Sequence, residues 1–192
     1  MSGFEILTIT FSFIVGLGVA QVLRSVAFVV REKGQVRMHW IPFWVAAMVL
    51  FFQVQFWFGL AVVNTLQDQW TWGVYGLMLM LAIFVFLSGA TVLPPVTSVG
   101  ERDLIEDFET RGRISLVFLA LYLVGWIGVG IVFWKPEFWQ LVVVNGLMSV
   151  LLMTAYFSSS SRTRTALHLA LIALTIYGAL TVWTTPSLEM PM

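Results

Sequence analysis

Amide side chains near the middle of apolar runs are the residues of this sequence with the clearest chemical potential. Gln53 and Gln55 lie in the stretch FFQVQFW, and Asn145 lies in a later run with Ser149 one helical turn further on. An amide in hydrocarbon must find a hydrogen-bond partner or face a polar pathway. Two positions apart on a helix, Gln53 and Gln55 point about 200° away from each other, so at most one can line a pathway. The amides predict either a mildly polar pore or an interhelical clasp between Asn145 and Gln53 or Gln55.

The first apolar run carries a second set of candidates. Ser12, Gly16 and Ala20 recur at every fourth position, which on a helix forms a stripe of small residues that lets another helix approach closely. Gln21 and Arg24 lie three apart on an adjoining face. Arg24 either extends its guanidinium to the lipid headgroups or contacts an anion in a vestibule. We expect these five residues at a helix interface or along a pore.

The two histidines are the candidates for holding a cofactor. His39 begins the second apolar run and His168 lies near the start of the last one, so both are expected at the same depth. Two imidazoles at one depth would suit haem or a metal ion if their helices were neighbours. Histidines also occur at membrane interfaces without a ligand. We therefore predict no metal and no cofactor other than lipid, with haem and quinone as alternatives.

Missing residue types exclude several classes of chemistry. The chain has no cysteine, which excludes disulfides, thiol catalysis and cysteine metal sites. The apolar runs contain no aspartate or lysine, and the sequence has neither a Gly-x-Ser-x-Gly arrangement nor a nucleotide-binding glycine motif. We do not expect an enzyme.

The composition of the chain indicates which secondary-structure elements position these residues. Of 192 residues, 59% are hydrophobic and 10% are charged, with a mean hydropathy of +0.93. Because a soluble domain carries about 25% charged residues, part of the solvent around this chain must be lipid. Six continuous apolar runs each suffice for a membrane-spanning helix of about 20 residues, and none alternates as barrel strands do. We predict an all-α protein with one six-helix transmembrane domain over 1–192, with spans at about 4–30, 40–64, 72–94, 114–134, 138–158 and 165–184.

The basic residues predict the orientation of these spans. Only Lys135 falls on one side of the predicted membrane, and the other nine lysines and arginines fall on the opposite side. By the positive-inside rule, the side with nine is cytoplasmic and both termini lie outside. Short loops favour a bacterial inner membrane with periplasmic termini. The nine residues are Arg24, Arg31, Lys33, Arg37, Arg102, Arg111, Arg113, Arg162 and Arg164.

One long polar stretch, TSVGERDLIEDFETRGR, interrupts the apolar runs between the third and fourth spans. Ser98 and Glu101 have the spacing of a capping box, and Leu104, Ile105 and Phe108 recur on one side of a helix. We predict a short amphipathic helix on the cytoplasmic surface. Three spans before it and three after it also allow the inverted arrangement found in some transporters, although only GLGVA in the first run and IGVGI in the fourth are alike.

The first run, FSFIVGLGVAQVLRSV, is followed by a basic turn and then by HW and QVQFWFGL. In these features the chain resembles a group of small bacterial polytopic membrane proteins, over about its first 65 residues. The resemblance implies the bacterial inner membrane and brings no activity, cofactor or catalytic residue.

Taken together, the sequence favours a non-enzymatic oligomeric channel or transporter for an ion or small solute. Mid-membrane amides, the small-residue stripe and the count of six spans support this expectation. The alternative is an accessory or assembly subunit of a larger membrane complex, and a haem- or quinone-binding protein is a third class. The expected partners are membrane lipids and either further copies of the chain or a larger complex, with no nucleic acid.

Overall fold

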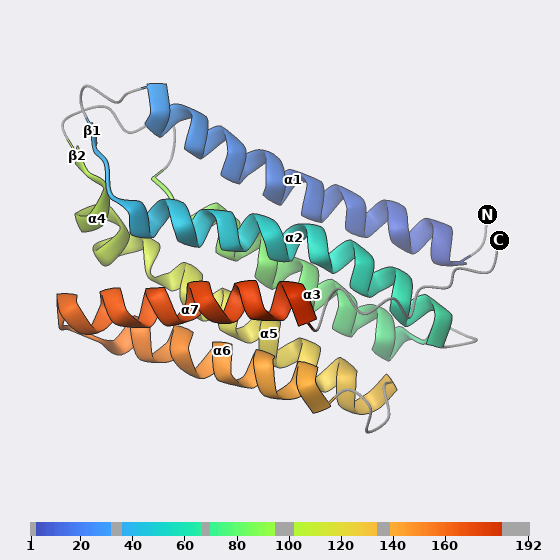
Figure 1. Ribbon diagram of the computed structural model, residues 1–192. Coiled ribbons are helices and arrows are strands. Elements are labelled where there is room, and N and C mark those ends of the chain that lie inside the picture. Colours follow the sequence, from blue (N-terminus) through green and yellow to red (C-terminus); the bar gives the residue numbers. More distant parts are fainter. Residues whose placement is uncertain (1–2, 32–35, 67–69, 95–101, 134–138, 182–192) are drawn as a thin grey trace.

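The structure is a computed structural model that describes residues 3–31, 36–66, 70–94, 102–133 and 139–181. Six of its helices are long and apolar enough to cross a membrane, which confirms the predicted all-α class with six spans (Figure 1). The chain is therefore a multi-pass membrane protein. The six helices are α1 (Gly3–Arg31), α2 (Trp40–Leu66), α3 (Trp72–Thr91), α5 (Ile114–Phe133), α6 (Trp139–Phe157) and α7 (Ser161–Thr181).

The helix ends lie within a few residues of the predicted ones. The predicted end of the last span, 184, lies outside the described residues, which stop at Thr181, and the two other larger differences have local causes. α3 stops at Thr91 rather than at 94, because Pro94 disfavours helical geometry in the residue before it. α7 begins four residues earlier than predicted, at Ser161. The hydroxyl oxygen of Ser160 accepts a hydrogen bond from the backbone N–H of Thr163 at 3.5 Å, which is the contact of a helix N-cap.

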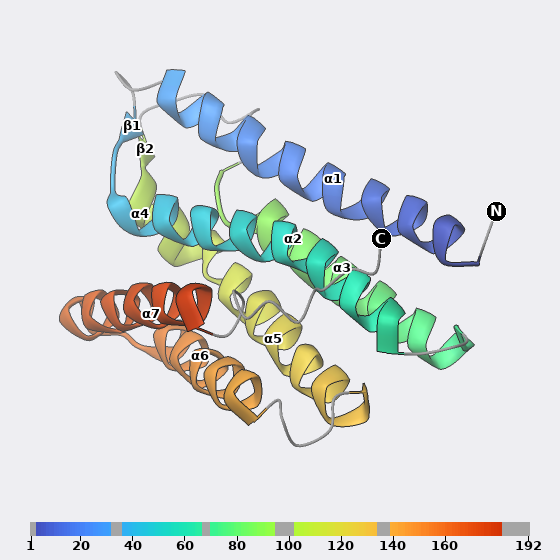
Figure 2. The ribbon, with the colours of Figure 1, turned by 45° about the vertical axis from the view of Figure 1, so that its right-hand side comes forward.

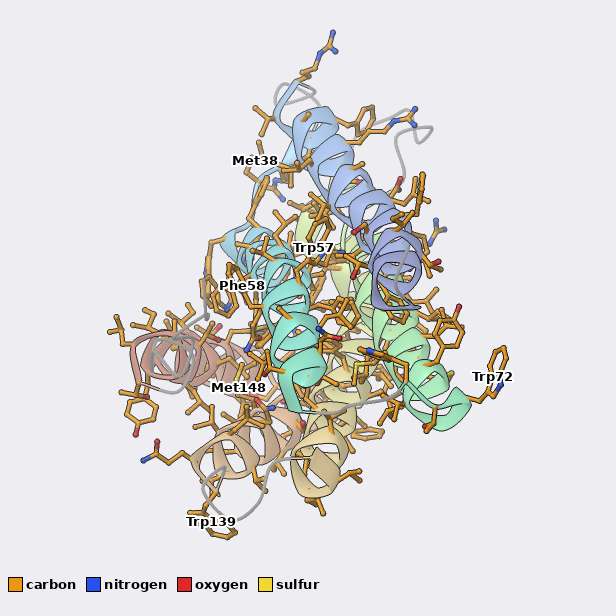
Figure 3. The ribbon with its side chains drawn as sticks, turned by 90° about the vertical axis from the view of Figure 1, so that its right-hand side faces the viewer. Met38, Trp57, Phe58, Trp72, Trp139 and Met148 are labelled. Carbon is orange, nitrogen blue, oxygen red and sulfur yellow. The ribbon has the colours of Figure 1, made fainter. Side chains whose placement is uncertain are left out.

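Five of the helices form a curved row in the order α1, α3, α5, α6 and α7, and each packs mainly against the next. α2 lies inside the curve. It packs against α1 and α3 and, less extensively, against α5 and α7. Figure 3, which looks along the bundle, shows α2 near the centre with the row around it and an opening between α1 and α7. The row therefore does not close around its central helix.

Bulky side chains fill the space between α2 and α5. The Tyr122 hydroxyl on α5 donates a hydrogen bond to the backbone carbonyl of Phe52 on α2 at 3.1 Å. The Tyr122 ring stands edge-on to the rings of Phe52 and Trp126, with centroids 5.9 and 6.3 Å away. Each such aromatic pair contributes about 0.5–1.5 kcal/mol beyond burial. This part of the interior is a packed core.

The connection from α1 to α2 meets the connection from α3 to α5 at one end of the bundle, where α1 finishes and α2 begins; we call it the basic end (Figure 2). Strand β1 (Val36–Arg37) pairs in parallel with β2 (Arg102–Asp103), and Arg37 lies 3.8 Å from the Asp103 carboxylate. The short helices α4 (Leu104–Asp107) and η1 (Phe108–Gly112), the latter a π-helix, follow β2. The pair therefore joins the two loops.

The short helix predicted between the third and fourth spans is confirmed. It buries Leu104 and Phe108 and leaves Glu106 exposed, as its amphipathic pattern requires. The predicted cap by Ser98 and Glu101 lies outside the described residues. Within them, the Asp103 carboxylate caps α4 by accepting from the N–H of Ile105 at 3.0 Å.

The two halves of the chain are packed differently. In the first half, α1 packs mainly against α3, and α2 lies across both. In the second half the middle helix, α6, packs against both α5 and α7, which make few contacts with each other. An inverted repeat would give corresponding pairs similar contacts, so the short GLGVA and IGVGI likeness has no counterpart in the packing.

A glycine on α1 makes its close approach to α2 and α3 possible. A Cβ atom on Gly18 would lie 2.6 Å from the Gln53 amide nitrogen and 3.4 Å from the Phe86 ring. The same nitrogen also lies beside Gly89 of α3, where a Cβ would be 2.8 Å away, so the carboxamide fills the space between the two glycines. Gly16, two residues away, has no atom within 4 Å of the corresponding position.

These two glycines provide a matched test of the packing. We expect Gly18→Ala to lower the free energy of unfolding by about 1–3 kcal/mol, the usual cost of overfilling a packed interior. Gly16→Ala should leave it unchanged or raise it, since alanine favours the helix. Thermal unfolding of both purified variants in detergent measures the difference, and equal melting temperatures would contradict the packing of α1.

Candidate functional site

The carboxamide of Gln53 joins three helices. It is 0% exposed, and its nitrogen donates to the Val85 carbonyl of α3 at 3.4 Å. Gly18 on one side and Gly89 on the other leave room for the amide group. Its oxygen is buried and has no hydrogen-bond partner among the described residues. Gln53 thus occupies the junction of α1, α2 and α3.

Gln55 points away from this junction, as the helical spacing predicts. Its side chain is half-buried, and within the described segments no residue forms a hydrogen bond with its carboxamide. Only one of the two glutamines is therefore held inside the bundle.

Asn145 and Ser149 lie at a different junction, between α5 and α6. Both are buried. The Ser149 hydroxyl lies 2.7 Å from the Asn145 backbone carbonyl and 3.5 Å from the Ala120 carbonyl, whereas the side-chain oxygen of Asn145 has no partner in the described part of the chain. The structure brings Asn145 neither to Gln53 nor to Gln55, so the amides do not line one path.

The small-residue stripe of α1 lies on the outside of the bundle. Ser12 is half-buried, Gly16 has open space beside it and Ala20 is exposed. Gln21 is half-buried and Arg24 is exposed. α1 instead buries the neighbouring stripe against α3 and α2, formed by Phe11, Val15, Gly18, Val22, Ser25 and Val29.

The two histidines have different surroundings. His39 accepts a hydrogen bond from the N–H of Ile41 at 3.3 Å through Nδ1 and stacks on Trp40. His168 is 1% exposed, with its ring edge-on to Phe108 at 6.3 Å. The cavity beside His168 has a volume of about 10 Å³, roughly enough for one water molecule. A haem does not fit beside this imidazole.

A polar cluster around His168 was not predicted from the sequence. Arg164 of α7 forms an ion pair with Glu109 of η1, and it also donates to the Ser158 and Ser159 carbonyls at 3.4 and 3.5 Å. Glu109 and Arg164 are 55 positions apart, so no local spacing indicates their contact. The pair fastens η1 to the start of α7.

Arg113, where η1 ends and α5 begins, completes this cluster. Its Nε is buried and, like Nδ1 of His168, has no hydrogen-bond partner among the described residues. Both residues line the small cavity together with Glu109 and Arg164. One water there could bond to several of these groups. Across the described segments no group of three or more histidine, aspartate or glutamate side chains could hold a metal ion. The cluster is suited to joining helices.

The opening between α1 and α7 exposes one face of α2, which we call the α2 face. Its members recur three or four positions apart along the whole helix, and many are aromatic. Phe58, 61% exposed, projects toward this opening in Figure 3, and Trp57 and Gln55 flank the face. The α2 face consists of Trp40, Trp44, Ala47, Phe51, Val54, Phe58 and Ala61.

Comparisons with known proteins add no assignment. No protein-family model, no curated protein and no solved structure matches the chain. The resemblance of the first run and its basic turn to small bacterial membrane proteins therefore stays a prediction.

The ion pair between η1 and α7 can be tested against a neighbouring carboxylate. We expect Glu109→Ala to lower the free energy of unfolding by about 1.5–3 kcal/mol, the range for hydrogen bonds to charged groups. Glu106→Ala, at an exposed position of the preceding helix α4, should leave the free energy of unfolding nearly unchanged. Thermal unfolding in detergent compares them. If both variants have the melting temperature of the native protein, the ion pair does not hold η1 in place.

Proposed function

We propose that this multi-pass membrane protein is a non-enzymatic assembly subunit of a larger membrane complex, and that the α2 face is its docking surface. The observation that carries the proposal is the incomplete cover of the central helix. The other five long helices cover one side of α2, whereas the α2 face keeps exposed side chains along its length, with Trp44 and Phe51 half-buried at its margin. A transmembrane helix of a partner would complete the ring.

The polar group beside this face supports a protein partner over lipid tails. Gln55 borders the α2 face on the side that faces α7. It lies seven residues after Met48, and therefore on nearly the same side of α2, and the Met48 sulfur lies 3.7 Å from the Thr175 hydroxyl of α7. Lipid tails offer no hydrogen bond to an amide, whereas a helix can supply a backbone or side-chain group. Interhelical bonds of this kind contribute about 1–2 kcal/mol in model peptides.

Transport by an oligomer is the second candidate, and the α1 stripe favours it. Ser12, Gly16 and Ala20 leave a shallow surface on α1 that would let a second copy approach closely. Gln53 and Asn145 lie at separate junctions, so a path for an ion or small solute would run between copies. Transport therefore depends on a homo-oligomer, whereas the subunit proposal depends on a different protein.

We also propose that the basic end faces the cytoplasm of a bacterium, with both termini on the periplasmic side of the inner membrane. Arg31, Arg37, Arg113 and Arg164 all lie at that end, among the turns that join α1 to α2, α3 to α5 and α6 to α7. Such an excess of arginine marks the cytoplasmic side of short-looped membrane proteins.

Single cysteines at the two ends of α6 test this orientation, because the chain has none of its own. Gln140 and Ser159 are both exposed. In intact spheroplasts, a membrane-impermeant maleimide should label Gln140→Cys and should label Ser159→Cys only after permeabilisation. The opposite pattern would reverse the orientation.

Substitutions of the two glutamines distinguish a role in binding the partner from a role in folding. We expect Gln55→Leu to reduce recovery of the partner from native membranes by about fivefold, equivalent to about 1 kcal/mol, with the melting temperature unchanged. Gln53→Leu should lower the melting temperature instead, because it removes the bond to Val85. Pull-down with mass spectrometry, and thermal unfolding in detergent, provide the two measurements.

A photo-crosslinker at Phe58 locates the contact. Met80 of the membrane-spanning helix α3 is the control, since its side chain is 49% exposed. A protein adduct at Phe58 and only lipid adducts at Met80 would support the proposal. Lipid adducts alone at both positions would contradict it, and adducts to a second copy would favour the oligomer instead.

A further inference from the structure

The outer surface of α5 and α6 carries a groove of about 750 Å³, here called the α5/α6 groove. Leu121 of α5 and Val150 and Met153 of α6 line it, and the small buried residues Ala120 and Ser149 also border it. At these small residues the helices approach closely, with the Ser149 hydroxyl 3.5 Å from the Ala120 carbonyl. The groove is as large as many ligand pockets, which span about 300–1,000 Å³.

One end of the groove is polar and the rest is apolar. Ser158 and Thr163 line it where α6 ends and α7 begins, at the basic end of the bundle. Arg162, next to Thr163 in the chain, is exposed. The first turn of α7 contains no acidic residue, and the nearby Glu109 carboxylate is already paired with Arg164. No described acidic residue pairs with Arg162, so an unpaired positive charge lies one residue along the chain from the groove lining.

We propose that the α5/α6 groove binds one anionic phospholipid, with an acyl chain along the apolar walls and its phosphate beside Ser158, Arg162 and Thr163. The groove lies within two membrane-spanning helices, so an acyl chain can enter from the bilayer. Arginines at a membrane surface attract anionic headgroups. The N-terminal end of α7 adds its partial positive charge. From the apolar walls to the polar end beside Arg162, the site follows the order of a phospholipid from tail to head.

A second copy of the chain matches the groove less well. In a membrane, two copies related by a twofold axis bring the same ends of the same helices together. Arg162 of each copy would then face the same cationic end of the other, and like charges repel. This proposal concerns a different surface from the α2 face and does not rest on the proposed function.

Native mass spectrometry of the detergent-purified full chain tests the site. Phosphatidylglycerol and phosphatidylcholine with identical acyl chains are titrated separately, and bound lipid is counted. Phosphatidylglycerol should bind about fivefold more tightly, the ratio for about 1 kcal/mol from one arginine near an anionic surface. Arg162→Gln should remove this preference, whereas Arg111→Gln, an exposed arginine of η1 at the same end, should keep it.

Filling the groove tests the position of the acyl chain. Val150 lines the groove and is 62% exposed, so Val150→Trp should block both lipids without disturbing the core. Leu147→Trp, on an exposed position of α6 outside the groove, is the control. Melting temperatures verify that both variants fold. Three results would each overturn the proposal. They are equal affinities for the two lipids, unchanged lipid binding to the Val150→Trp variant, and a native dimer that Val150→Trp dissociates.

Discussion

The hydrocarbon of the bilayer offers no hydrogen bonds, and this constraint shapes the whole structure. It forces the spanning backbone into helices, and it also requires partners for the polar side chains between them. Backbone carbonyls supply many of these partners: the Ser88 hydroxyl donates to the Ser115 carbonyl at 2.9 Å, the Tyr122 hydroxyl to Phe52 and the Gln53 amide to Val85. The polar side chains of this protein therefore serve mainly to fasten one helix to another.

Side-chain size then decides where the helices meet. Gly18 and Gly89 leave room for the Gln53 amide, and Gly59 lets the Trp126 ring lie against the α2 backbone. Away from such contacts, large side chains face the bilayer. The result is an open row around α2 with two distinctive outer surfaces, the aromatic α2 face and the α5/α6 groove. The first suits a helix with a polar group near its middle, and the second suits an amphiphile with a negative head.

The basic end links these surfaces to the loops. The β1–β2 pair joins the α1–α2 connection to the α3–α5 connection, and α4 and η1 follow β2. The Glu109–Arg164 ion pair fastens η1 to the start of α7. The ion pair anchors the loop helix. Arg162, two residues before Arg164, is exposed and forms no ion pair with the described residues, so its positive charge stays available next to the groove lining.

The sequence alone determined the six spans, the short helix between the third and fourth, and the opposite directions of Gln53 and Gln55, because these follow from local hydropathy and helical geometry. Only the tertiary structure decided that Gly18 rather than Gly16 is packed, that Gln53 lies inside while Gln55 lies at the edge, that Asn145 belongs to another junction, and that Glu109 meets Arg164. The reason is physical: a membrane helix that is apolar on every side carries little periodic signal for its covered face, and a contact between residues far apart in the chain has no spacing that reveals it.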